Sequence, residues 1–181
     1  MGNEAEIVGP RQRSPWRVAG WTIAGIILLV PIVAMQFTRE VNWSVGDFIF
    51  AAIMIGSVGL LFELTVRASP NRSFRGGVAA ALFASFLIIW ANGAVGMIGD
   101  EDNPYNLLFL AVICVALLGA TIASFRPTGM AAAMLAAGIA HGAIAIGGMP
   151  FDMRGGTISL FLSTIWLFSA ALLRNAGKAQ S

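Results

Sequence analysis

The twenty residues from Gly129 to Gly148, GMAAAMLAAGIAHGAIAIGG, contain no charged side chain apart from a histidine. A helix rises about 1.5 Å per residue, so about 20 apolar residues cross a hydrocarbon core about 30 Å thick. Small residues recur every four positions, as at Ala133 and Ala137, and they form a groove in which a neighbouring helix can approach closely. This stretch therefore predicts a membrane helix at the centre of a bundle.

The rest of the chain has the same character. Of its 181 residues, 57% are hydrophobic and only 11% are charged, and the mean hydropathy is +0.80. Soluble domains contain roughly 45–50% apolar and about 25% charged residues. We therefore predict an all-α integral membrane bundle with room for about six crossings and no soluble domain.

Hydropathy windows of about 19 residues divide the chain into six transmembrane helices. They cover Trp16–Phe37, Asp47–Val66, Gly76–Ile98, Tyr105–Phe125, Thr128–Gly147 and Thr157–Leu173. The shortest break is Arg126–Pro127, where proline disfavours helix at the preceding residue. The predicted organisation is a cytoplasmic tail over 1–15, a single six-helix transmembrane domain over 16–174 and a cytoplasmic tail over 175–181. The first apolar run is too long for a typical signal peptide and is expected to stay as a helix.

The basic residues predict the orientation. With a cytoplasmic N-terminus, nine of the eleven Lys and Arg residues fall inside and two, Arg39 and Arg154, fall outside. Loops rich in Lys and Arg stay in the cytoplasm, so both termini are predicted to be cytoplasmic. Most acidic residues, among them Asp47 and Asp152, then lie outside.

Small residues mark the predicted packing faces, because helices in lipid associate by close contact. Helix five, and with it helix three through GGVAAALFAS (76–85), is expected at the centre, with the bulkier helices one and six facing lipid. The same faces of helices three and five could join two copies of the chain or bind other membrane subunits.

His141 is the only histidine, about 21 Å along helix five from its cytoplasmic end. An ionisable group at that depth is a candidate functional residue. Asn92, near the outer end of helix three, lies at a similar depth, and the two could face each other in a small polar pocket open to the outside. The alternative is structural: a neutral histidine hydrogen-bonded to a backbone carbonyl or to Asn92, which then joins two helices.

Two further groups carry charge near the ends of helices. Glu63 precedes Arg67 by four residues, the favourable order for an ion pair along one helix face. Asp100, Glu101 and Asp102 precede helix four, where acidic side chains oppose the positive end of the helix dipole. The run could attract a hard cation such as calcium, but it lacks the ligand spacing of an EF-hand, and a solvated helix cap is the favoured interpretation.

Several activities find no support in the residues. The lone Cys114 excludes a disulfide framework or a CxxC site within one chain, and no predicted span contains a lysine for a Schiff base. The sequence lacks GxSxG, P-loop, Rossmann and HExxH patterns. Thioethers together with His141 could in principle bind Cu(I), but no motif brings them together. We expect no metal, no cofactor and no nucleic-acid partner.

The segments VNWSVGDFIFAAIMIGSVGLLFEL (41–64) and WANGAVGMIGDEDNPYN (90–106) resemble stretches of small polytopic inner-membrane proteins of bacteria that have no assigned activity. The resemblance covers roughly helix two to the start of helix four. It implies a location in the bacterial inner membrane and supplies no catalytic residue.

Three functions remain open on these grounds. The favoured one is a non-catalytic accessory or oligomeric component of a membrane assembly, embedded in the lipid bilayer. The second is a small permease or channel for a cation or small solute, with an outer vestibule at Asn92 and His141. The third is a membrane enzyme with His141 as general base, which lacks a second buried titratable group nearby.

Overall fold

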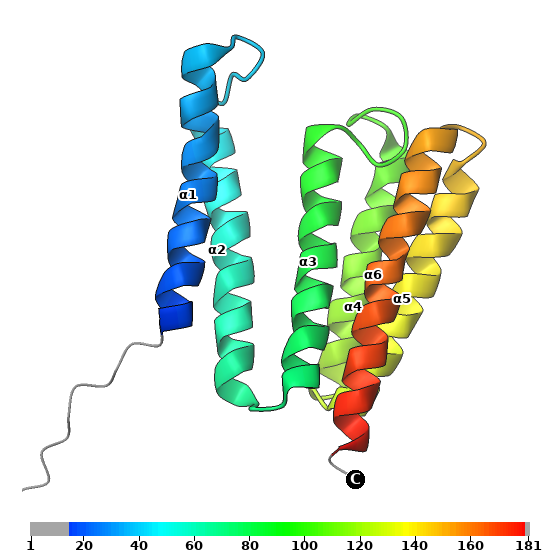
Figure 1. Ribbon diagram of the computed structural model, residues 1–181. Coiled ribbons are helices and arrows are strands. Elements are labelled where there is room, and N and C mark those ends of the chain that lie inside the picture. The colour runs from blue at the N-terminus through cyan, green and yellow to red at the C-terminus, as the bar shows by residue number, and fades with distance from the viewer. Residues whose placement is uncertain (1–14, 180–181) are drawn as a thin grey trace, which may run out of the picture. The chain divides into compact units, whose positions relative to one another are not determined.

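The structure is a computed structural model that describes residues 15–179, and the side chains of residues 18–179. All regular secondary structure over this range is helical (Figure 1). The helices are α1 (Pro15–Phe37), α2 (Val45–Ala68), α3 (Arg72–Ala94), the short η1 (Pro104–Asn106), α4 (Leu107–Ile122), α5 (Pro127–Gly148) and α6 (Met153–Lys178). Six helical segments in the described chain are long and apolar enough to cross a membrane, with η1 and α4 counted as one. The predicted helix number is confirmed.

The helix ends differ from the predicted spans by a few residues. α3 stops at Ala94, four residues early, because the chain turns at Gly96, whose φ of +77° suits glycine and whose N–H bonds to the Ala91 carbonyl. α6 begins at Met153, capped by the Asp152 side chain. It continues to Lys178, so the predicted C-terminal tail from 175 is helical over its first residues.

The shortest predicted break is confirmed. α4 ends at Ile122, and Ser124 and Phe125 adopt left-handed φ angles of 49° and 57°. α5 then begins at Pro127, a residue whose fixed φ and missing N–H suit a first helical turn. A turn of four residues is therefore enough to reverse the chain between two long helices.

The chain divides into two compact units, residues 1–59 and 60–181. In the first unit, α1 and the start of α2 are joined by a turn in which Ser44 and Asp47 cap α2. The Ser44 N–H and hydroxyl both donate to Asp47 Oδ2, at 2.7 and 2.9 Å, in the arrangement of a capping box. Further along α2, Gly59 lets the Trp21 ring approach, since an added Cβ would lie 3.2 Å from it.

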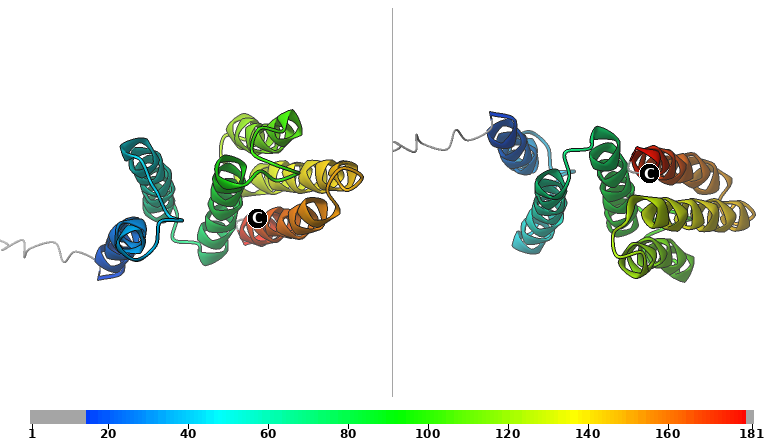
Figure 2. Two further views of the ribbon diagram at one scale, coloured as in Figure 1. Left: turned by 90° about the horizontal axis from the view of Figure 1, so that it is seen from above. Right: turned by 90° about the horizontal axis from the view of Figure 1, so that it is seen from below.

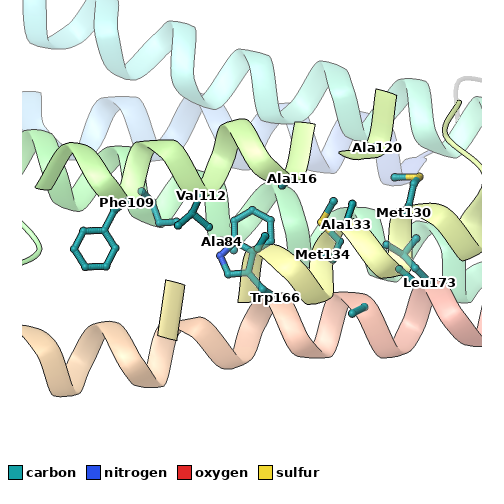
Figure 3. Close-up of a cluster of buried hydrophobic side chains, with 14 of the residues drawn as sticks. Ala84, Phe109, Val112, Ala116, Ala120, Met130, Ala133, Met134, Trp166 and Leu173 are labelled. Atoms are coloured by element: carbon teal, nitrogen blue, oxygen red, sulfur yellow. The ribbon is translucent and has the colours of Figure 1, made fainter. Parts of the chain in front are cut away.

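The second unit contains a bundle of α3, α4, α5 and α6. α5 contacts both α4 and α6, and α6 also contacts α3, as the end-on views show (Figure 2). α5 is the most buried span, as predicted, with half of its most apolar window buried. Together with its neighbours it forms a core of packed side chains that includes Phe109, Val112, Met134 and Trp166 (Figure 3).

The predicted position of helix six at the lipid-facing periphery is wrong. α6 has a larger buried share than α3, 39% against 22% of the most apolar window. The reason is a face of small side chains, Ser159, Ser163 and Ser169, which are all buried, opposite a face of exposed bulky ones such as Phe161. Serines mark this packing face as clearly as glycines and alanines do.

Candidate functional site

The acidic run lies in the exposed loop between α3 and η1. Asp100, Glu101 and Asp102 are all exposed, and the residue that caps the following helix is Asn103, whose Oδ1 accepts from the Tyr105 N–H at 3.0 Å. Among the described residues, no group of three or more His, Cys, Asp or Glu side chains is placed to hold a metal ion. The three acidic side chains are therefore solvated in the loop, and the side chain that caps η1 is the amide of Asn103.

A buried asparagine that the sequence did not single out orders this loop. Asn106 is 3% exposed. Its Oδ1 accepts from the N–H groups of Met97 and Ile98, at 3.1 and 2.8 Å, and its Nδ2 donates to the Asp100 carbonyl at 2.7 Å. One side chain thus gives hydrogen-bond partners to two N–H groups and one carbonyl of the loop, which would otherwise have none.

Asp152 fastens the same loop to α6. Its Oδ1 accepts from the N–H groups of Arg154 and Gly155 at the start of α6, and its Oδ2 accepts from the Gly99 N–H, all at 3.0 Å. The hydrogen bond from Gly155, followed by the one from Gly99, lowers the pKa of Asp152 below its ordinary value of 3.8. The carboxylate therefore stays ionised and joins the α3–α4 loop to the α5–α6 turn.

Tyr105 adds a third link at this end of the unit. Its hydroxyl donates to the Ile144 carbonyl of α5 at 2.7 Å. Gly147 leaves the space that this hydroxyl needs, since an added Cβ would lie 2.7 Å from it. The loop is thus held to α6 by Asp152 and to α5 by Tyr105. We call these polar contacts the clasp.

His141 lies inside the bundle of the second unit. It is 1% exposed, and its ring packs edge-on against Phe109 of α4, with ring centroids 5.2 Å apart and planes at 71°. Neither ring nitrogen has a hydrogen-bond partner in the described part of the protein. The imidazole is therefore enclosed by the helices and does not line an outer vestibule.

The predicted hydrogen bond between Asn92 and His141 is absent from the described part of the protein. Asn92 is half-buried, and its Nδ2 donates to the Ile88 carbonyl of its own helix at 2.8 Å. Similar depth along two helices does not decide how each helix is rotated about its axis, and the two side chains do not meet in a hydrogen bond.

The boundary ion pair is present. The Arg67 guanidinium contacts the Glu63 carboxylate one turn earlier in α2, with the arginine largely exposed and the glutamate mostly covered. Nearby, Arg75 of α3 donates through Nε to the Ser69 carbonyl at 2.6 Å and through a terminal nitrogen to the Val66 carbonyl at 2.7 Å. Arg75 thus gives a partner to carbonyls at the end of α2, where helical carbonyls lack one.

Trp166 is the second buried polar residue that sequence reasoning missed. The ring is 0% exposed, and its Nε1 has no partner among the described residues. Ser163, one turn earlier on α6, is also buried and donates to the Leu160 carbonyl at 2.6 Å. In the described part of the protein, the side chains around Trp166 are arranged by packing and by this hydrogen bond.

Comparisons with known proteins find no match for this chain among protein-family models, curated proteins or solved structures.

Proposed function

We propose that this protein is a six-span protein of the bacterial inner membrane and a non-catalytic component of a membrane assembly. The support for the location is the length and hydropathy of the six helices, together with the resemblance of residues 41–64 and 90–106 to small inner-membrane proteins. In the second unit, Arg72, Arg126 and Arg174 belong to one end of the bundle, whereas Asp100–Asp102 and Asp152 belong to the other. By the positive-inside rule, the arginine end is cytoplasmic.

The observation that carries the proposed role is the outer face of α5. This helix has small side chains on two sides. One side, with Ala137 and Gly138, is buried in the bundle, so the small-residue packing predicted for helix five is partly used within the chain. The other side, with Ala132, Ala136 and Ala143, is exposed. These alanines recur at intervals of four and seven residues among the larger exposed side chains of Leu135, Ile139 and Ile146, and small residues at such positions suit the close approach of another helix.

Helix three offers less surface of this kind. Gly77 of α3 packs against Leu173 of α6 so closely that an added Cβ would lie 2.6 Å from Leu173 Cγ. Its neighbour Gly76 lies against Leu172 in the same way, with 3.3 Å to Cδ1. Of the two predicted partner surfaces, the proposal therefore retains the outer face of α5.

Two single-cysteine variants test the partner surface. In a Cys114→Ser background, Ala136→Cys places a thiol on the outer face of α5, and Ala137→Cys places one on the buried side at the adjacent residue. We expect a benzophenone attached at position 136 to crosslink to a second copy or to another membrane subunit in native membranes. The label at position 137 is expected to give no adduct. Absence of an adduct at 136, with a strict monomer in mild detergent, contradicts the proposal.

Thiol labelling tests the location and orientation. In the same Cys114→Ser background, Asp102→Cys is expected to react with a membrane-impermeant maleimide added to intact cells, and Arg174→Cys only after the membrane is opened. Reaction of both cysteines from the same side contradicts the six-span topology. The competing function, a permease, predicts solute flux into proteoliposomes that His141→Ala abolishes, and such a result would replace the accessory role.

A further inference from the structure

Two unpartnered polar side chains lie in the core of the second unit, on facing helices. His141 of α5 and Trp166 of α6 are both more than nine-tenths buried, and three of their nitrogens have no hydrogen-bond partner among the described residues. Buried polar groups in native proteins nearly always have a partner, either a protein atom or ordered water. These nitrogens therefore need a hydrogen-bond partner.

The two side chains belong to the same level of the α5–α6 contact. An added Cβ at Gly138 would lie 3.1 Å from Trp166 Cβ, and one at Gly142 would lie 3.6 Å from Ser163 Oγ. His141 stands between these two glycines in the sequence, and its ring rests on Phe109. Figure 3 shows the indole nitrogen of Trp166 on the side of the ring toward Phe109.

The contact between α5 and α6 is loosest next to His141. At Gly138 an added Cβ would lie 2.8 Å from Leu167 Cδ2 of α6, and at Gly156 of α6 it would lie 2.6 Å from Met149 Cγ at the end of α5, so no atom fits there. At Gly142 the nearest atoms, Leu160 Cδ1 and Ser163 Oγ, are both at 3.6 Å, which is an ordinary contact distance. Space for a group the size of a methyl is thus left at Gly142, the residue next to His141.

The donors and acceptors define what can bind. The Trp166 Nε1–H only donates, and a neutral imidazole donates from one nitrogen and accepts at the other. Ser163 directs its hydroxyl hydrogen to the Leu160 carbonyl, so its oxygen is available as an acceptor. A guest must therefore accept from the indole and also donate to an acceptor, within a small space. Water has two donors and two acceptors and meets both requirements.

We propose that His141, Ser163 and Trp166 form an internal hydration site between α5 and α6 of the second unit. The bound water accepts from the indole N–H and donates to the imidazole or to the Ser163 oxygen. The site is independent of the proposed partner surface, which lies on the exposed side of α5. It gives a polar role to the only histidine in the chain.

Solution NMR of the protein in detergent micelles tests the site directly. The indole N–H signal of Trp166 is identified by its loss in Trp166→Phe, and we expect a cross-peak between this N–H and water in the wild type. Gly142→Ala fills the space, so it is expected to remove the cross-peak while the indole signal stays. Gly20→Ala is the control, because an added Cβ there meets no atom within 4 Å and leaves the site unchanged.

The histidine is tested by a matched pair of variants. His141→Gln keeps a donor and an acceptor and is expected to retain the cross-peak, whereas His141→Leu is expected to lose it. A wild-type protein without the cross-peak overturns the proposal, whatever the variants do. An apparent Tm for His141→Leu that rises by about 2–4 °C also overturns it, because it shows that the imidazole had no partner to lose.

Discussion

Asp152 Oδ2 accepts a hydrogen bond from the Gly99 N–H at 3.0 Å across 53 residues of sequence. The same carboxylate caps α6 through the N–H groups of Arg154 and Gly155. The Asp152 side chain thus caps α6 and also binds the loop after α3, so that this loop and the turn before α6 are held together. The predictions below begin with this contact.

Replacement of Asp152 by alanine should free the loop between α3 and α4. Three backbone N–H groups lose their acceptor, and the loop loses its link to the start of α6. We expect faster hydrogen exchange at residues 96–100 and in the first turn of α6. Asp152→Asn, which keeps a single side-chain acceptor oxygen, should give an intermediate rate. Unchanged exchange in Asp152→Ala contradicts the clasp.

The clasp should withstand mild acid. Because its hydrogen bonds lower the pKa of Asp152 below 3.8, the folded state holds the proton less tightly than the unfolded state. The stabilisation is therefore fully present above the unfolded pKa and is lost as the pH falls through the lower folded value. Protection of the Gly99 amide should stay constant from about pH 7 to about pH 4.5 and decrease only in stronger acid. A loss of protection near pH 6 contradicts this assignment.

Asn106 should be the most sensitive polar residue of the loop. Asn106→Ala leaves the buried N–H groups of Met97 and Ile98 and the Asp100 carbonyl without their partner, which we expect to cost about 2–4 kcal/mol. Asn92→Ala is the matched control, because the Nδ2 of Asn92 bonds to its own helix, and the expected cost is below about 1 kcal/mol. Thermal unfolding in one detergent compares the two. Equal losses contradict the role of Asn106.

The sequence predicted the features that depend on local composition. The six helices, the break at Pro127 and the Glu63–Arg67 pair all follow from residues within a few positions of one another. The missed features depend on rotation and on distant contacts. Asn92 bonds to its own helix and not to His141, and the bond between Asp152 and Gly99 joins residues 53 positions apart in the sequence. No hydropathy window contains that information.

Ser169 joins α3 to α6 in the core and gives a fourth test. Its hydroxyl donates to the Gly77 carbonyl at 2.7 Å, 92 residues away in sequence. Ser169→Ala should destabilise the second unit by about 0.5–1.5 kcal/mol, since this bond links two helices. Thr121→Ala is the control, because the exposed Thr121 hydroxyl bonds to Leu117 of its own helix. A control that costs as much as Ser169→Ala contradicts the interpretation.

The glycines of the chain should divide into two groups by their response to alanine. At Gly119 an added Cβ would lie 2.5 Å from Ala133 Cβ and 3.3 Å from its Cα, so α4 and α5 must separate, at an expected cost of about 1–3 kcal/mol. At Gly25 of α1 no atom lies within 4 Å of the new Cβ. Helix propensity then favours alanine by about 0.8–1 kcal/mol, and Gly25→Ala should not destabilise the protein. Thermal unfolding of both variants in the same detergent measures the difference. A stable Gly119→Ala would mean that α4 and α5 are not in close contact, and the central position of α5 in the bundle would then be wrong.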